Sequence, residues 1–359
     1  MSHPGAPSNR GVGARRSSRS TFRLVPACAP TFARMFVAGC RRVASRVAAL
    51  SVCLSMAFAV HAQSPATAGA DDEPLLWTAS ATGRPTLLLL PTIHELGHDD
   101  PRIDARLQRL VGRVEAVVLE APIDEPPKVL SAMRKYAFYG NDDNITNHLR
   151  SITPEQLARC ARAENKSIVQ FFQLKPWLAA LDIATHRPVR GTGNGGKDVQ
   201  KRPRMGIDQR LFRLATNSHR PVLYLETVEE GLRVLDTLPA DEQEAWLRDA
   251  CNSLATGLTP DEVPVEEFED AWIRGDIAKF ENLTTVPRPG GKPEIFDANQ
   301  RIFQGGTDIF AAAIARYGYF HGKGPILVAV GAGHFFGKRS LLNELEAAGY
   351  QVKAPRGGA

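Results

Sequence analysis

The segment His94-Glu95-Leu96-Gly97-His98 matches the pattern H-E-x-x-H. In zinc peptidases this pattern lies on a helix, where the two histidines bind the metal and the glutamate acts as the base. Only a helix brings positions i and i+4 to one ion. The preceding residues, Leu87–Ile93, instead predict a buried strand that runs into a turn, and Gly97 and Pro101 weaken any helix here. Two interpretations follow: a zinc peptidase that uses His94, Glu95 and His98, or a turn in which His94 acts with distant residues.

A second apolar strand leads into a histidine in the same way. Ile326–Val330 is unbroken and apolar, and it runs into Gly331-Ala332-Gly333-His334. Two further predicted strands end in carboxylates, Glu120 and Glu226. The strand ends of α/β sheets are where reactive groups gather. Two histidines and one or two glutamates can hold a divalent metal ion that activates water for hydrolysis.

Each of these residues also has a structural interpretation. His334 could be a hydrogen-bonded histidine at a tight turn, although the glycines before it indicate a close approach of the backbone to another group. Glu120 could cap a helix or pair with an arginine, and Glu226 could be a buried hydrogen-bonding post. His98 lies beside two aspartates, which favours a solvated loop. The distance between His94 and His334 decides whether they can form a metal site. Side chains more than roughly 8–10 Å apart cannot share one ion with bonds of ~2.1 Å.

The elements that must position these residues alternate between strands and helices. This pattern predicts a mixed α/β fold (α+β in the broad sense), with histidine-bearing turns at strand ends and a helical cap over about residues 127–205. Within the cap, residues 188–205 are rich in Gly, Lys and Arg, which predicts a mobile loop. The expected strands are 75–78, 86–90, 116–120, 221–226, 326–330 and 350–352, with long helices at 104–113, 206–218, 297–317 and 340–348; the helix at 297–317 is expected to be loosened by Gly305-Gly306.

The first 62 residues have the features of a targeting segment. An apolar run at 47–60 follows three arginines and precedes Val60-His61-Ala62, which suits cleavage of a signal peptide; Met35 would give it an ordinary length. Residues 63–74 are expected to be a flexible linker and 75–355 the folded domain. The whole chain has a formal net charge of +5, and residues 1–62 contain nine Arg and no acidic residue, so the remainder carries −4. We therefore expect an exported, periplasmic or envelope protein, without a membrane span after cleavage and without a nucleic-acid partner.

Two cysteines, Cys160 and Cys251, remain after the targeting segment is removed. An oxidising compartment would allow them to form a disulfide. Two separate buried thiols are the alternative.

Several motifs spread along residues 75–355 resemble the TraB/GumN family, which is related to the Tiki-type metalloproteases. The resemblance implies a mixed sheet wrapped by helices, an envelope location, and a metal or catalytic centre formed by His94, His334 and Glu120. The motifs are Thr92-Ile93-His94, Val117-Val118-Leu119-Glu120, Leu174-Lys175-Pro176-Trp177, Gly206-Ile207-Asp208, Leu225-Glu226-Thr227, Val330-Gly331-Ala332-Gly333-His334 and Gly349-Tyr350-Gln351-Val352.

The chain departs from the family pattern at two places. Pro91 stands where the first Gly-x-x-His motif has glycine, and proline fixes φ and removes an N–H donor. Gly306-Thr307 stand where the family has an Arg-Asn pair, although Arg301 would substitute in a shifted register. If that pair takes part in catalysis, the chain would be a weakened or inactive member.

Together these features predict an exported metal-dependent hydrolase, and among hydrolases a peptidase is considered. His94, His334 and Glu120 would hold a divalent metal, with Glu120 and Glu226 as the catalytic carboxylates. The substrate is an unidentified peptide or small molecule, and the sequence leaves the oligomeric state open. The first alternative is a catalytically inactive binding or regulatory protein of the same fold. The second is the H-E-x-x-H zinc peptidase.

Overall fold

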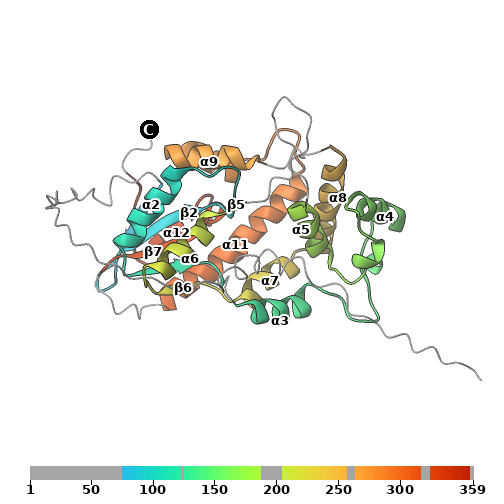
Figure 1. Ribbon diagram of the computed structural model, residues 1–359, viewed down its shortest axis with the longest axis horizontal. Coiled ribbons are helices and arrows are strands. Elements are labelled where there is room, and N and C mark those ends of the chain that lie inside the picture. Colours follow the sequence, from blue (N-terminus) through green and yellow to red (C-terminus); the bar gives the residue numbers. More distant parts are fainter. Residues whose placement is uncertain (1–74, 123–124, 187–203, 257–262, 317–323, 356–359) are drawn as a thin grey trace, which may run out of the picture.

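The computed structural model describes residues 75–122, 125–186, 204–256, 263–316 and 324–355. The targeting segment and linker predicted within residues 1–74 lie outside this part of the chain. Helices surround a mixed six-stranded sheet, and two further strands pair beside it (Figure 1). The mixed α/β fold expected from the sequence is confirmed.

The main sheet consists of β1 (Trp77–Ser80), β2 (Leu87–Thr92), β4 (Ala116–Leu119), β6 (Val222–Tyr224), β7 (Ile326–Gly331) and β8 (Gln351–Lys353). Their order is β6-β4-β7-β2-β1-β8. The four strands from β6 to β2 run parallel, whereas β1 is antiparallel to both of its neighbours. The ends of four parallel strands therefore meet at one edge of the sheet.

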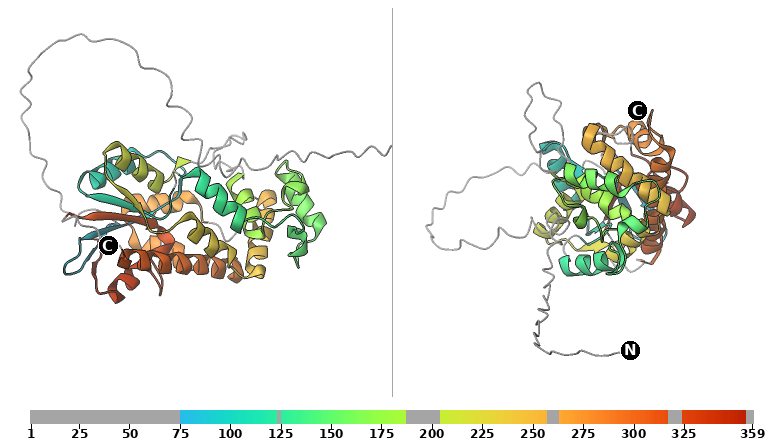
Figure 2. Two further views of the ribbon diagram at one scale, coloured as in Figure 1. Left: turned by 90° about the horizontal axis from the view of Figure 1, so that it is seen from below. Right: turned by 90° about the vertical axis from the view of Figure 1, so that its right-hand side faces the viewer.

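The two central strands are apolar because helices cover both faces of the sheet. Every residue of β2 and of β7 is buried. Fully buried parallel strands are continuous apolar runs without alternation, and this is why both could be predicted from the sequence. α2 (Pro101–Gly112) and α6 (Ile207–Asn217) lie on one face, and α11 (Pro293–Arg316) and α12 (Leu341–Ala347) lie on the other (Figure 2).

Pro91 lies within β2 rather than in the turn after it. The Thr86 carbonyl accepts from the Ile326 N–H on β7, so alternation along the strand turns the backbone groups of Pro91 toward the side of β1. β1 pairs with β2 only as far as Leu89, and the Pro91 carbonyl accepts from Trp272 Nε1 at 2.9 Å. The missing N–H of the proline thus faces a side where none of the described strands pairs with it.

A helical cap stands beside the sheet. It consists of α3 (Pro126–Tyr136), the 3₁₀ turns Ile145–Asn147 and Ile168–Gln170, α4 (Pro154–Ala163), α5 (Pro176–His186) and α8 (Ala240–Thr256). Its own apolar core includes Ile145, Leu157, Phe171, Ile183 and Leu247, all of which are fully buried. Thr153 caps α4 ahead of Pro154, as predicted. The cap is therefore a packed unit, and it extends beyond the predicted range by α8.

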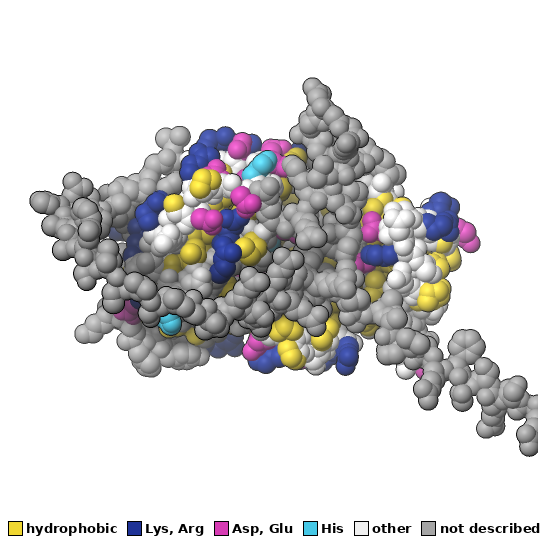
Figure 3. Space-filling model, in the orientation of Figure 1, with side chains coloured by type: hydrophobic (Ala, Val, Ile, Leu, Met, Phe, Trp, Pro, Cys, Tyr) yellow, Lys and Arg dark blue, Asp and Glu magenta, His cyan; other side chains and the backbone are white. Residues whose placement is uncertain are grey.

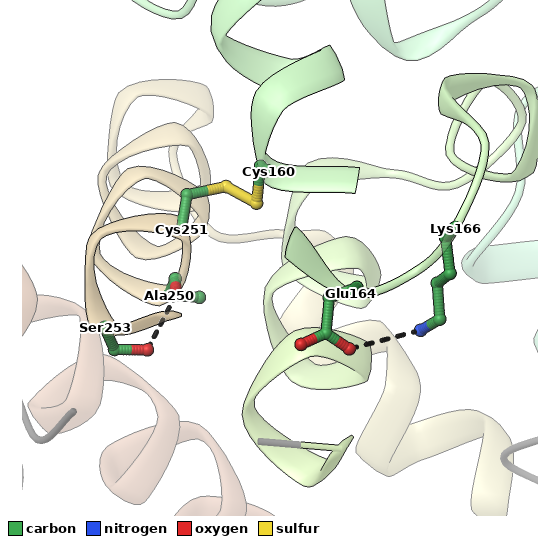
Figure 4. The surroundings of a disulfide bond; sticks show 6 residues. All are labelled: Cys160, Glu164, Lys166, Ala250, Cys251 and Ser253. Atoms are coloured by element: carbon green, nitrogen blue, oxygen red, sulfur yellow. Dashed lines mark hydrogen bonds and ion pairs between the residues drawn. A yellow bond between two sulfur atoms is a disulfide. The ribbon is translucent and has the colours of Figure 1, made fainter. Parts of the chain in front are cut away.

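A disulfide joins Cys160 of α4 to Cys251 of α8 across 91 residues of sequence. Figure 4 shows it among the cap helices, near the Lys166–Glu164 ion pair and the Ser253 hydroxyl, which donates to the Ala250 carbonyl. Of the two alternatives for these cysteines, the structure contains the disulfide.

α7 (Val228–Asp236) and α11 connect the cap to the sheet, and α9 (Val265–Arg274) and α10 (Ile277–Thr285) complete the set of helices around it. Figure 1 shows α11 running diagonally from beside α8 and α5 to the region of the sheet. The expectation that Gly305-Gly306 loosens this helix is wrong, because α11 continues through both. The two glycines are instead positions of close packing against Val234 and His334.

The segment around residues 188–205 differs in part from the predicted loop. Arg204–Met205 forms β5, which pairs with β3 (Glu95–Leu96) in a second, two-stranded sheet. Residues 187–203 lie outside the described part of the chain. On the face shown in Figure 3, Lys and Arg side chains lie among Asp, Glu and apolar ones. Within the described ranges, no helix is both long and apolar enough to cross a membrane.

Candidate functional site

Four strand-end residues come together at the edge where the parallel strands end. His94 follows β2, Glu120 follows β4, Glu226 follows β6 and His334 follows β7. The chain thus brings together side chains that are up to 240 positions apart in sequence, because parallel strands place their carboxyl ends at the same edge.

Glu120 lies between the two histidines. Its Oε1 accepts a hydrogen bond from the Gly331 N–H at 2.5 Å, which fixes the carboxylate against the end of β7. Its Oε2 lies 3.7 Å from His94 Nε2, and its Oε1 lies 3.8 Å from His334 Nε2. A methyl group placed on Gly331 would lie within 4 Å of all three side chains. The two imidazoles are therefore well inside the limit of roughly 8–10 Å for sharing one ion.

His94 is bound on its other side by an aspartate. His94 Nδ1 lies 3.1 Å from Asp208 Oδ1, at the start of α6, and the ring is 62% exposed. The negative charge of Asp208, with a further contribution from Glu120, raises the pKa of His94 to about 10. Burial disfavours the charged form of Asp208, but the charge and hydrogen bond of His94 outweigh it and keep the pKa of Asp208 below its usual range. The raised pKa favours the protonated ring, which lies between the carboxylates of Asp208 and Glu120.

His334 has the opposite character. It is buried, and burial lowers its pKa. Its Nδ1 lies 3.0 Å from the Phe303 carbonyl and 3.1 Å from the Thr307 hydroxyl. A carbonyl only accepts, so Nδ1 carries the proton and Nε2 presents a lone pair toward Glu120. The ring occupies the space above Gly306, where a Cβ would lie 2.6 Å from His334 Cε1.

Glu226 is a second carboxylate at the same edge. Burial, together with the charges of Glu120 and Glu230, raises the pKa of Glu226 to about 8. Its backbone N–H donates to the Glu120 carbonyl at 2.9 Å, which ties the two strand ends together. A carboxyl group whose pKa is raised in this way is suited to act as an acid.

The H-E-x-x-H segment does not form a helix. Glu95 and Leu96 form β3, which removes the i, i+4 geometry that the zinc peptidase interpretation needs. His98 faces a different carboxylate, with its Nδ1 3.0 Å from Glu269 Oε2, and Glu269 also accepts from the backbone N–H of Gly97 and His98. Glu269 thus anchors the loop, and His98 takes part in that anchor.

The departures noted in the sequence can now be placed. Gly306 and Thr307 both face His334, so no arginine side chain stands at that position. Arg301 does not substitute for it, because its Nε bonds Glu242 of α8 at 2.8 Å. Pro91 lies within β2 and not in the turn that carries His94.

His94, His334 and Glu120 are residue types that can bind a divalent metal ion. Two imidazole nitrogens and a carboxylate are ligands that Zn²⁺ and related ions accept. Gaps of 3.7 and 3.8 Å exceed hydrogen bonds and are shorter than the roughly 4.2 Å spanned by two ligand bonds of ~2.1 Å. Yet no three His, Cys, Asp or Glu side chains in the described ranges are already gathered into a metal-binding group. The two gaps are thus within the span of two ligand bonds, although the described side chains are not gathered around one common position.

The fold and this edge define an α/β protein with two histidines and two glutamates at the ends of four parallel strands. The model of the TraB/PrgY/gumN family matches residues 75–354, which is most of the chain, and the chain belongs to this family. No match was found among curated proteins or among solved structures.

Three groups at the edge were not predicted from the sequence to take part in the site: Asp208, the Phe303 carbonyl and the Thr307 hydroxyl. Asp208 lies in the motif Gly206-Ile207-Asp208, so its position was marked but its partner was not. Thr307 was noted only as a departure from the family pattern. A backbone carbonyl leaves no signal in the sequence, so Phe303 could not have been found.

Proposed function

We propose that this protein is an exported metal-dependent hydrolase, with a peptide or small molecule as substrate. His94, His334 and Glu120 would hold the ion, and Glu226 would serve as the second catalytic carboxylate. A divalent ion at this edge would supply Lewis-acid polarisation of a carbonyl or activation of water. His94 would bind through its Nε2, the nitrogen that faces Glu120, and would lose the proton there on binding.

One observation carries the proposal. His334 Nε2 is an acceptor, because the Nδ1 of the ring donates to the Phe303 carbonyl, and Glu120 Oε1 accepts from the Gly331 N–H. They face one another across 3.8 Å with no hydrogen bond between them. Two lone pairs in this arrangement repel unless a cation or a donor lies between them. A metal ion satisfies both, and the nearby His94 supplies a third ligand.

Export is supported by the N-terminal sequence and by the disulfide. The arginines and apolar run before residue 62 are typical of a signal peptide, and disulfides persist mainly in oxidising compartments. Sequencing the N-terminus of the mature protein tests this, with Gln63 as the expected first residue.

Metal analysis of the purified protein tests the site. We expect one divalent ion per chain in the wild type and a large loss in His94→Ala and in His334→Ala. His148→Ala is a matched control, because this histidine stacks on Tyr139 in the cap. A wild type without any divalent ion, or an ion content that neither variant changes, would exclude the proposed site.

A second candidate is a catalytically inactive binding or regulatory protein of the same fold. The observation that favours it is that Gly306 and Thr307, which stand in place of the family's Arg-Asn pair, contact His334. Fluorogenic peptide and ester substrates separate the two candidates. Hydrolysis by the wild type that is lost in Glu120→Gln supports the hydrolase, whereas a metal-loaded protein without any hydrolysis supports the binding protein.

A further inference from the structure

The start of α6 meets the segment that carries His94 at three points. The Ile207 N–H donates to the Ile93 carbonyl at 2.9 Å. Gly206 lies directly against the backbone of His94, because a Cβ on this glycine would be 2.1 Å from the His94 carbonyl oxygen. Asp208 then reaches the ring itself at 3.1 Å. Three consecutive residues therefore hold the backbone on both sides of the histidine and its side chain.

Glycine at position 206 is required for space. Its φ of −66° is one that any residue can adopt, so backbone freedom does not explain it. The close approach does, since a contact of 2.1 Å with a backbone atom cannot be relieved by turning a side chain. Any larger residue would push α6, and Asp208 with it, away from His94.

Arg210, two residues after Asp208 on α6, adds to this attachment. Arg210 is buried, and its guanidinium bonds Asp104 at 2.8 Å and Asp99 at 2.6 Å, while its Nε donates to the Met205 carbonyl. These contacts tie α6 to the loop and helix that follow the His94 turn. The position of Asp208 relative to His94 is thus fixed by contacts on both sides of it.

We propose that Gly206-Ile207-Asp208 is the device that orients His94, and that Asp208 is its positioning residue. By holding Nδ1, the carboxylate leaves only Nε2 free to act, and it turns that nitrogen toward Glu120. A carboxylate on the far nitrogen of a metal-binding histidine fixes the ring and makes it a better ligand. The inference rests on the proposed function, because it assigns Asp208 the role of orienting His94, one of the proposed metal ligands.

The test is a double-mutant cycle on Zn²⁺ affinity, measured by calorimetry with the ion alone. We expect Asp208→Ala to weaken binding about 10–100-fold. Asp208→Asn keeps an acceptor for Nδ1 and should recover part of this loss. In a His94→Ala background, Asp208→Ala should have no further effect, because its action passes through the ring. Equal losses in both backgrounds, or no loss in either, would overturn the inference.

A second measurement does not depend on metal binding. NMR of the metal-free protein with ¹⁵N-labelled histidine should show a hydrogen-bonded His94 Nδ1 proton that disappears in Asp208→Ala. A wild type that binds no Zn²⁺ but shows this proton would exclude the proposed function and retain the positioning device. A wild type in which the His94 ring samples several orientations would exclude the device, whatever the outcome for the ion.

Discussion

The cap and the sheet edge are held together by different kinds of contact. The cap has an apolar core and a disulfide between α4 and α8. The sheet edge depends on polar contacts between distant segments, such as Gly331 with Glu120 and Asp208 with His94. Apolar burial and a covalent bond provide stability, whereas the polar contacts fix the direction of individual nitrogens and oxygens. Changes in the cap should therefore alter stability, and changes at the edge should alter ion binding.

The largest effect is expected from removing the disulfide. Replacing Cys160 and Cys251 together with Ala should lower the free energy of unfolding by about 2–4 kcal/mol, since the unfolded chain gains the freedom of a long loop. Urea unfolding monitored by circular dichroism measures this change. Zn²⁺ affinity should stay the same, and a parallel loss of affinity would contradict the separation of the two regions.

The second largest effect is expected from changing a buried carboxylate in the cap, Glu244. Glu244 accepts from the backbone N–H groups of Arg150, Ser151 and Ile152 at 2.7 to 3.0 Å. Glu244→Gln places an amide N–H where acceptors are needed and should cost about 1–3 kcal/mol at pH 7. Asp241→Asn, at the exposed start of the same helix, is the matched control.

The contribution of Glu244 to the free energy of unfolding should also depend on pH. Burial raises its pKa, but the hydrogen bonds from the Ser151, Arg150 and Ile152 N–H groups outweigh burial and hold the pKa below its ordinary value. A carboxyl group whose pKa is lowered by folding stabilises the fold at pH values above its pKa in the unfolded chain, about 4.3. This stabilisation is lost as the pH falls through its pKa in the folded protein. The difference between wild type and Glu244→Gln should shrink below about pH 4. A difference that grows on acidification would show the opposite linkage.

At the sheet edge, Gly306→Ala should act on ion binding. The new Cβ would lie 2.6 Å from His334 Cε1 and displace the ring, so Zn²⁺ affinity should fall about tenfold, or about 1.4 kcal/mol. Gly305→Ala is a close control, because its Cβ would contact Val234 at 2.8 Å instead. Equal Zn²⁺ affinities for the two variants would mean that the position of the His334 ring does not affect Zn²⁺ binding.

The smallest effect is expected from His98→Ala. Its ring pairs with Glu269 and not with Glu120, so Zn²⁺ affinity should change by less than about twofold. The H-E-x-x-H interpretation makes the contrary prediction of a nearly complete loss. Calorimetry on this single variant distinguishes them.

The strand-end residues could be predicted because their signal is local. An apolar run such as Ile326–Val330 marks a buried strand, and parallel strands bring His94, Glu120 and His334 to one edge. The role of Asp208 could not be predicted, since its contact with His94 spans 114 positions and depends on how α6 packs. β5 was missed because a strand of two residues has no periodicity to detect.

α11 has contacts in both regions of the molecule. Its 24 residues form a continuous rod about 36 Å long. Arg301 fastens it to α8 in the cap, and the Phe303 carbonyl, barely half a turn away, holds His334. One continuous helix therefore contacts both the cap and His334, whereas the contacts of α6 are with His94.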